Sequence, residues 1–222
     1  MANILLGVTG SVAAVKTPEL VSALRQRGHA VKVVATSHAL YFFDPATLDG
    51  SRVVRNPEVV IVDDDEWPGR ADGLRYQRGD RVMHVELRRW ADLFLVAPVD
   101  ANTLAKFAAG LSDNCLTCVW RAWDPTRPIV LAPAMNTMMW EHPMTRRHLR
   151  AIAADAGAGH VPGHLDDEAT LAQINSRSRT FRIVAPQVKE LACGDVGTGA
   201  MADVPGLVAA VEELLAPFVA RP

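Results

Sequence analysis

The fold is decided by the stretch ANILLGVTGSVAAVKTPELVSALRQRGHAVKVVAT, residues 2–36. It begins with a short apolar run, continues with apolar residues at helical spacing as far as Gly28, and ends with a second apolar run over residues 30–36. A strand, a helix and a strand in such close succession form a right-handed βαβ unit, which begins a parallel sheet. The stretch therefore predicts an α/β protein.

The rest of the chain repeats this alternation. Further strands are predicted at VVIV from Val59, HVEL from His84, LFLVAP from Leu93, PIVLAP from Pro128 and RIVAP from Arg182. Helices are predicted over residues 100–109, 113–123, 144–156 and 205–219. Because strands and helices alternate throughout, we expect a doubly wound parallel sheet with helices on both faces, in a single three-layer domain over residues 1–222.

Two polar segments interrupt the alternation without dividing the chain into two domains. Residues 63–80, DDDEWPGRADGLRYQRGD, are rich in turn-forming residues and predict an exposed loop. Residues 163–180, GHLDDEATLAQINSRSRT, show little periodicity and are typical of an insertion or a flap. Together with the glycine-rich stretch that follows, this second segment predicts a flap or an insertion over residues 163–203.

Composition limits the partners that the protein can have. The chain has 222 residues with 23 basic and 25 acidic side chains, so its formal charge of −2 favours neither nucleic acid nor a membrane surface as a partner. No apolar run reaches the roughly 20 residues that a membrane helix needs, and no signal-peptide pattern is present. With only 3 cysteines, we expect a cytoplasmic protein with reduced thiols that binds small molecules or protein.

The first candidate site is the segment GVTGSVAA, residues 7–14. Gly10 permits a tight turn, and Ser11 opens a helix whose free N–H groups can hold a phosphate. The segment lacks the G-x-G-x-x-G spacing, and the second strand ends in Thr36 and Ser37 without the acidic residue that binds a dinucleotide ribose. The pattern therefore favours a mononucleotide over NAD, although a plain strand-to-helix connection fits the same residues.

Two further strand ends, VAPVDANT and LAPAMNTMMW, carry similar polar groups. In the first, Asp100, Asn102 and Thr103 can cap a helix while their side chains face a ligand, or they can serve as caps alone. In the second, Asn136 is an amide among apolar side chains, and a bound substrate could supply the hydrogen bonds that it needs. The methionines beside it are more typical of core packing: Met135, Met138 and Met139.

Three cysteines and one histidine complete the candidates. Cys193 lies in the glycine-rich stretch LACGDVGTGAMAD, which can open and close over a site, although an isolated loop cysteine is usually inert. Cys115 and Cys118 form a C-x-x-C one helical turn apart, where small buried side chains are expected, and without a second ligand pair we expect no metal site. His84 taken alone is more often a structural residue.

Taken together, five segments resemble the homo-oligomeric flavin-containing cysteine decarboxylases. They occur in the family's order as GVTGSVAAVK, HVELRRWADLFLVAPVDANTLAK, LSDNCLTCVWRAWD, PAMNTMMWEHP and LACGDVGTGAMA. The most specific element is P-x-M-N-x-x-M-W, which is met by Pro133, Met135, Asn136, Met139 and Trp140. The resemblance implies a Rossmann-like (flavodoxin-like) fold and a homo-oligomer, either a trimer or a dodecamer of trimers.

The resemblance also implies the cofactor and the site residues. FMN is the implied cofactor, and the implied FMN-binding residues are Gly10, Ser11, Val12, Thr36, Ser37, Pro98, Asp100, Ala101, Asn102 and Thr103. The implied catalytic residues are His84, Asn136 and Cys193, of which Cys193 is a proton donor. The implied substrate-binding residues are Met135, Asn136, Met139, Lys189 and Leu191.

The implied reaction is decarboxylation of a terminal cysteine. A carboxylate beside an unactivated thiol carbon has no electron sink, and no side chain accepts hydride, so a flavin must first oxidise that carbon. Within the family, the motifs best match the enzymes of coenzyme A synthesis that convert phosphopantothenoylcysteine to phosphopantetheine.

Two alternatives remain open. The chain has Glu190 between Lys189 and Leu191 where these enzymes carry arginine, so a peptide ending in cysteine is an alternative substrate, as in aminovinyl-cysteine peptide biosynthesis. A non-catalytic flavoprotein that regulates a phosphatase is a third possibility. The presence of His84, Asn136 and Cys193 argues against it.

Overall fold

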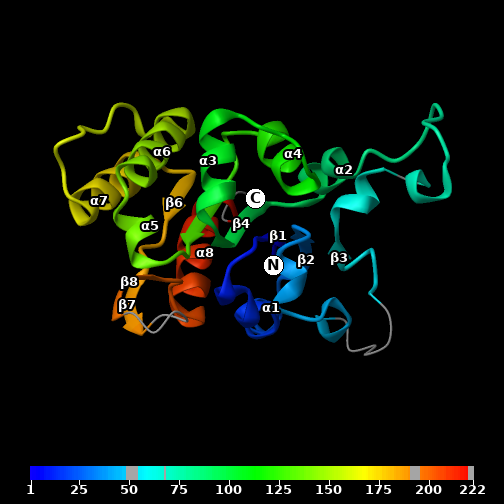
Figure 1. The fold of residues 1–222 in the computed structure, drawn as a ribbon, viewed down its shortest axis with the longest axis horizontal. Coiled ribbons are helices and arrows are strands. Elements are labelled where there is room, and N and C mark those ends of the chain that lie inside the picture. Colours follow the sequence, from blue (N-terminus) through cyan, green and yellow to red (C-terminus); the bar gives the residue numbers. More distant parts are fainter. Residues whose placement is uncertain (49–54, 68, 191–195, 220–222) are drawn as a thin grey trace.

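A computed structural model describes residues 1–48, 55–67, 69–190 and 196–219 of the chain (Figure 1). Six strands form one parallel sheet in the order β3-β2-β1-β4-β5-β6, which confirms the predicted doubly wound α/β fold. The strands are β1 (Asn3–Val8), β2 (Ala30–Ala35), β3 (Val60–Ile61), β4 (Leu93–Val99), β5 (Ile129–Pro133) and β6 (Phe181–Ile183).

Helices cover both faces of this sheet. On one face lie α1 (Thr17–Gln26) and α8 (Val204–Val219), whose apolar side chains share a cluster with alternate residues of β1, β2, β4 and β5. On the other face lie α2 (Met83–Trp90), α3 (Ala101–Ala109), α4 (Cys115–Ala122), α6 (Pro143–Ala153) and α7 (Asp167–Arg177). Every residue of β4 is buried, as expected for a parallel strand covered on both faces.

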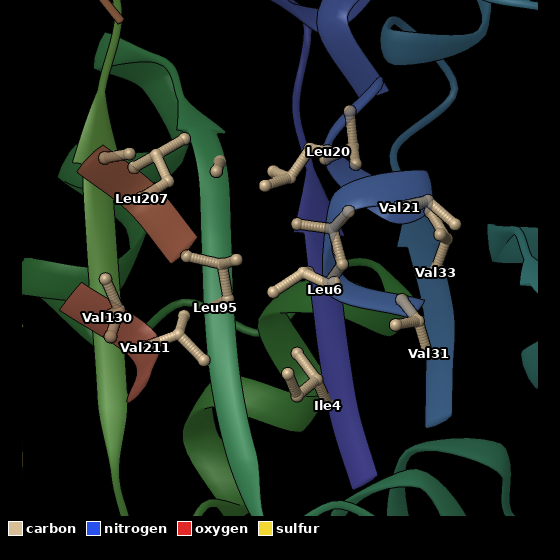
Figure 2. Packing of buried hydrophobic residues seen from close by; sticks show 14 of the residues in the cluster. Ile4, Leu6, Leu20, Val21, Val31, Val33, Leu95, Val130, Leu207 and Val211 are labelled. Carbon is tan, nitrogen blue, oxygen red and sulfur yellow. The ribbon is translucent and has the colours of Figure 1, made fainter. Parts of the chain in front are cut away.

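The packing of α1 and α8 explains the regular spacing of apolar residues in the sequence. Ile4 and Leu6 of β1 point from the sheet toward α1, while Leu207 and Val211 of α8 lie over β4 and β5 (Figure 2). All four of these side chains are fully excluded from solvent. Removing one such side chain from water contributes about 1.5–3 kcal/mol to folding.

A small antiparallel hairpin stands apart from the main sheet. It consists of β7 (Gln187–Glu190) and β8 (Val196–Ala200), which pair directly. The prediction of a glycine-rich loop is therefore wrong for residues 196–200, which form a strand. The strand is held against the segment before α5 (Thr137–Glu141), because the backbone N–H of Met135 donates to the carbonyl of Gly199 at 3.0 Å. The hairpin and α5 lie side by side (Figure 1).

The strand predicted at HVEL is also wrong, because these residues belong to α2. Met83 and Leu87 are the buried residues of this helix, and they are four positions apart. That spacing places them on one helical face. The local alternation of His84 and Val85 suggests a strand only because the segment is short.

Two segments predicted from their polar composition contain regular structure. Within the segment predicted as an insertion or a flap, residues 167–177 form α7, and Thr170, Leu171 and Ile174 are buried on its inner face. The predicted loop 63–80 begins with a short 3-10 turn, Asp63–Glu66, which we call the acidic turn. Glu66 is only 6% exposed, so the loop is not exposed throughout.

Two kinds of feature are absent from the part of the chain that the structure describes. Among the described residues, none of the helices combines the length and the apolar character needed to cross a bilayer. The same residues contain no cluster of three or more His, Cys, Asp or Glu side chains that could hold a metal ion.

Candidate active site

The strands β2 and β3 lie on one side of β1, and β4, β5 and β6 lie on the other, so the strand order switches between β1 and β4. The predicted cofactor residues lie at this switch point. Thr9, which follows β1, donates its hydroxyl to the carbonyl of Pro98 at 2.9 Å and accepts the backbone N–H of Asp100 at 2.8 Å. These bonds tie the end of β1 to the end of β4. Ligands of doubly wound sheets bind in the crevice at this position, beyond the carboxyl ends of the strands.

The turn after β1 is shaped so that only glycine fits. A Cβ atom on Gly10 would lie 2.6 Å from the Cβ of His38, which follows β2. The close approach brings the turn beside Thr36 and Ser37. The hydroxyl of Thr36 is buried, and among the described residues it has no hydrogen-bond partner. A buried polar atom of this kind is expected to bind a ligand or water.

The start of α3 provides a second group of polar atoms at the same crevice. Asp100 caps this helix by accepting the backbone N–H of Thr103 at 2.7 Å. The N–H groups of Ala101 and Asn102 belong to the first turn, where a helix offers no backbone acceptor of its own. Asn102 is exposed, whereas Pro98 and Thr103 are buried. The start of α3 can therefore bind an anion through its backbone.

A pocket of about 470 Å³ opens beside this crevice. It lies between the turn after β1, the end of β5 and the strand β8. Of the predicted site residues, Ser11, Val12, Met135, Asn136 and Lys189 line it. The other lining residues are Ala13, Val15, Lys16, Glu19, Ala134 and residues 199–205.

Asn136 presents one half of its amide to this pocket. Its Oδ1 atom accepts the backbone N–H of Met139 at 2.8 Å, which caps the short helix α5. The amino group of the amide is then the part that remains to bind a ligand. Asn136 is itself exposed, while Trp140 of the same helix is 3% exposed and anchors it to the core.

The methionines of this segment divide into two kinds. Met135 is 8% exposed and belongs to the core cluster, as core packing predicts. Met138 and Met139 are 76% and 50% exposed, so the core-packing interpretation is wrong for these two. Together with Asn136, they form an exposed patch of apolar and amide groups at the start of α5.

His84 lies in a different part of the sheet edge, against the acidic turn. Its backbone N–H donates to Oε2 of Glu66 at 3.0 Å, and its Nδ1 atom is hydrogen-bonded to Oε1 of the same carboxylate. Glu66 is a residue that the sequence prediction misses, because it lies in the segment predicted as an exposed loop. Its position just beyond the carboxyl end of β3 is the one signal that could have found it.

The acidic turn also contacts the start of α4. The backbone N–H of Cys115 donates to Oδ1 of Asp63 at 3.2 Å, and burial raises the pKa of that carboxyl. Burial and the adjacent Glu66 carboxylate raise the pKa of the Cys115 thiol far above its ordinary range. A thiol in this state is neutral and unreactive at pH 7. The prediction of a small buried side chain is therefore correct for Cys115, while Cys118 is half-buried.

The structure brings most of the predicted residues together but separates His84 from Asn136. Asn136 follows β5, whereas His84 is bonded to the turn that follows β3. Four steps of about 4.8 Å separate those strands, or about 19 Å across the sheet. The helices α2 and α5 accordingly lie on opposite sides of the molecule (Figure 1). Leu191 and Cys193 lie outside the described residues.

Comparison with known proteins gives a consistent result. The profile of the Flavoprotein family matches residues 1–216. Phosphopantothenoylcysteine decarboxylase of Mus musculus is 42% identical over 214 residues, which cover 96% of this chain and 87% of that protein.

Solved structures agree with the sequence match. A phosphopantothenoylcysteine (PPC) decarboxylase mutant complexed with pantothenoylaminoethenethiol is 38% identical, with a TM-score of 0.72 and coverage of 95% of this chain and 96% of that one. The FMN-binding protein AtHal3 is 38% identical, with a TM-score of 0.69 and 95% coverage of both chains. The FMN-dependent cysteine decarboxylase SpaF is 25% identical, with a TM-score of 0.62 and coverage of 95% and 98%.

Proposed function

The chain belongs to the Flavoprotein family, and on that basis we propose that it is an FMN-dependent decarboxylase that converts phosphopantothenoylcysteine to phosphopantetheine. The observation that carries this proposal is the 42% identity to the mouse phosphopantothenoylcysteine decarboxylase over 96% of the chain. The test is a direct assay of purified protein with phosphopantothenoylcysteine. Release of CO2 and formation of phosphopantetheine are the expected results.

The crevice between β1 and β4 fits FMN. The turn at Gly10 packs directly against His38, where any side chain would clash, and the buried hydroxyl of Thr36 beside it needs a partner. We assign the FMN phosphate to Ser11, Ser37 and the start of α3, where hydroxyl and backbone N–H groups can bind it. Bound FMN supplies an acceptor and donor of hydride for the carbon that bears the substrate thiol, which no side chain can provide.

Within the pocket, Asn136 is assigned to the substrate carboxylate. Its Oδ1 atom is already used as a helix cap, so the amino group is free to donate to a carboxylate oxygen. Met135 and Ala134 form an apolar wall beside it. This arrangement holds the carboxylate in one orientation until CO2 leaves.

The separation of His84 from Asn136 supports a homo-oligomer, for which we propose a trimer or a larger assembly of trimers. Both residues are assigned to one reaction, yet His84 is bonded to the turn after β3 and Asn136 follows β5, four strand positions away in the sheet of a single chain. Contact between copies would place His84 of one chain near the pocket of another. The exposed apolar side chains beside the pocket are suited to such a contact: Met138, Met139, Val188 and Val196.

A peptide ending in cysteine is the second candidate substrate. The similarity to the FMN-dependent cysteine decarboxylase SpaF covers nearly all of both chains and favours it. The charge change at Glu190 in the sequence points the same way, because a phosphorylated substrate is better matched by a cation. The lower identity of 25% places this candidate second. Assaying both substrates side by side decides between them.

Purified protein is expected to bind FMN more tightly than NAD. The turn at Gly10 and the start of α3 provide for one phosphate, and β2 ends in Thr36 and Ser37 without an acidic residue for a dinucleotide ribose. Titration of the apoprotein with each cofactor, followed by fluorescence, measures both dissociation constants. Tighter binding of NAD would contradict the assignment.

Product mass is expected to distinguish the two substrate classes. A phosphopantothenoylcysteine decarboxylase releases a thiol lighter by CO2 alone, with Cys193 as the proposed proton donor in the final reduction. A serine hydroxyl is a far poorer acid than a cysteine thiol. Cys193→Ser is therefore expected to release product lighter by CO2 plus two hydrogens. Mass spectrometry of the products of both proteins measures this difference.

The wild type serves as the reference in that experiment. If it already releases the oxidised product from every accepted substrate, the reductive ending is wrong and the peptide decarboxylase is favoured. An unchanged product distribution in Cys193→Ser would remove Cys193 from the mechanism.

A further inference from the structure

We propose that Glu66 is a positioning residue for His84. It holds the imidazole with a proton on Nδ1, which leaves Nε2 unprotonated and able to exchange a proton with the substrate. The inference rests on the proposed function, because it gives His84 a role in proton transfer. It adds to that function a residue for which no role has been assigned.

The contact between the two residues uses both oxygens of one carboxylate. Oε2 of Glu66 accepts the backbone N–H of His84 at 3.0 Å, while Oε1 is bonded to Nδ1 of the imidazole. The two residues are 18 positions apart, so the contact depends on the fold. The Glu66 side chain is only 4% exposed, and the His84 side chain is 25% exposed. The Glu66 carboxylate is therefore buried beneath the His84 ring, and the ring is the part of the pair that reaches solvent.

The chemistry of a carboxylate determines which ring nitrogen carries the proton. An ionised carboxylate only accepts hydrogen bonds, so Nδ1 must be the donor. In the neutral ring Nε2 is then unprotonated. Nε2 lies on the side of the ring away from Nδ1, and hence away from the buried carboxylate. Fixing the tautomer through a second hydrogen bond is how proteins commonly select the reactive nitrogen of a histidine.

Neighbouring groups hold Glu66 in this position. Asp65, the residue before it, forms two bonds with the guanidinium of Arg55, at 2.6 and 3.0 Å, and accepts the backbone N–H of Val62 at 2.8 Å. Asp63, at the start of the same turn, accepts the backbone N–H of Cys115 at 3.2 Å. Because these bonds fix the turn on both sides of Glu66, its carboxylate is held beside His84.

A purely structural role for Glu66 makes a different prediction. The bond to the backbone N–H of His84 alone would cap the first turn of α2, where Val82 has no capping side chain. Loss of a cap lowers stability without changing which nitrogen of His84 is protonated. The proton position therefore separates the two roles.

Glu66→Gln is the decisive substitution. The glutamine oxygen can still accept the backbone N–H of His84, but its amino group can only donate to Nδ1, so the ring proton is expected to move to Nε2. The position of the proton is measured from the ¹⁵N chemical shifts of the imidazole nitrogens in histidine-labelled holoprotein. The signals of His84 are those that are missing from the spectrum of His84→Asn. We expect about 10²-fold lower kcat with little change in KM, since Glu66 is assigned no contact with substrate.

Glu86→Gln is the matched control. Glu86 lies on the same helix, two residues beyond His84, and makes an exposed ion pair with Arg81 at 2.7 Å. This variant is expected to keep both the wild-type tautomer and the wild-type kcat. A Glu66→Gln protein that retains the proton on Nδ1, or that changes tautomer with unchanged kcat, overturns the proposal. If the wild type decarboxylates neither substrate, the proposed function fails, and the tautomer comparison still decides whether Glu66 sets the proton position.

Discussion

Replacing Asn136 by Asp is expected to lower kcat/KM by about 10³-fold while leaving the fold and the FMN content unchanged. Aspartate caps helices as well as asparagine does, so α5 keeps its bond to the backbone N–H of Met139. The variant loses the amino group assigned to the substrate carboxylate. It also places a second carboxylate, with its negative charge, beside that of the substrate. Two like charges about 4 Å apart repel by about 4 kcal/mol near a protein surface, which corresponds to about 10³-fold.

The measurement is steady-state decarboxylation together with flavin absorbance and thermal unfolding. Asn114→Asp is the matched control, because Asn114 caps α4 through the same kind of bond, to the backbone N–H of Thr117 at 2.9 Å, and does not line the pocket. The control is expected to retain wild-type activity. Full activity of Asn136→Asp would show that Asn136 does not contact the substrate carboxylate.

The success of the sequence in predicting this fold has a simple physical basis. Strands buried on both faces are nearly continuous apolar runs, and β4 and β5 are of this kind. Helices that cover a sheet repeat their apolar residues every three to four positions, as Leu20, Val21 and Leu24 of α1 do. Both patterns depend only on local composition, so they can be read without any knowledge of the contacts between segments.

The errors occur where contacts between distant segments determine the structure. Residues 196–200 contain two glycines and predict a loop, yet they form β8 because Gly197 and Gly199 allow its backbone to approach α5 and Met135 closely. The charged residues of the acidic turn predict an exposed loop. Glu66 is nevertheless buried, because the turn is bonded to Arg55, His84 and Cys115, and a local pattern reveals none of these contacts.

The same distinction applies to the candidate site. Asp100 follows β4 directly and Asn136 lies three residues beyond the end of β5, so the rule that ligands bind beyond strand ends identifies them from sequence. Glu66 also follows a strand, but β3 has only two residues and gives a weak signal. The separation of His84 from Asn136 depends on the order of strands in the sheet, which the sequence pattern does not determine.

Gly199→Ala is expected to destabilise the hairpin and to disrupt the pocket. Gly199 has a φ of +151°, a conformation that other residues rarely adopt, and an added Cβ would lie 2.1 Å from the carbonyl oxygen of Met135. Backbone strain of this kind costs about 1–3 kcal/mol, and the clash with a backbone atom adds to it. Relief requires β8 to move away from Met135, which breaks the bond between the Met135 N–H and the Gly199 carbonyl.

Movement of β8 reaches the site because Met135, Asn136 and Gly199 line the same pocket. We therefore expect a free energy of unfolding lower by at least about 1–3 kcal/mol and decarboxylase activity lower by at least about tenfold. Denaturant unfolding and steady-state kinetics measure the two effects. Gly163→Ala is the matched control, since a Cβ at that exposed position meets no atom within 4 Å and the backbone is not strained. Equal stability and activity in the two variants would mean that contact between β8 and Met135 does not shape the pocket.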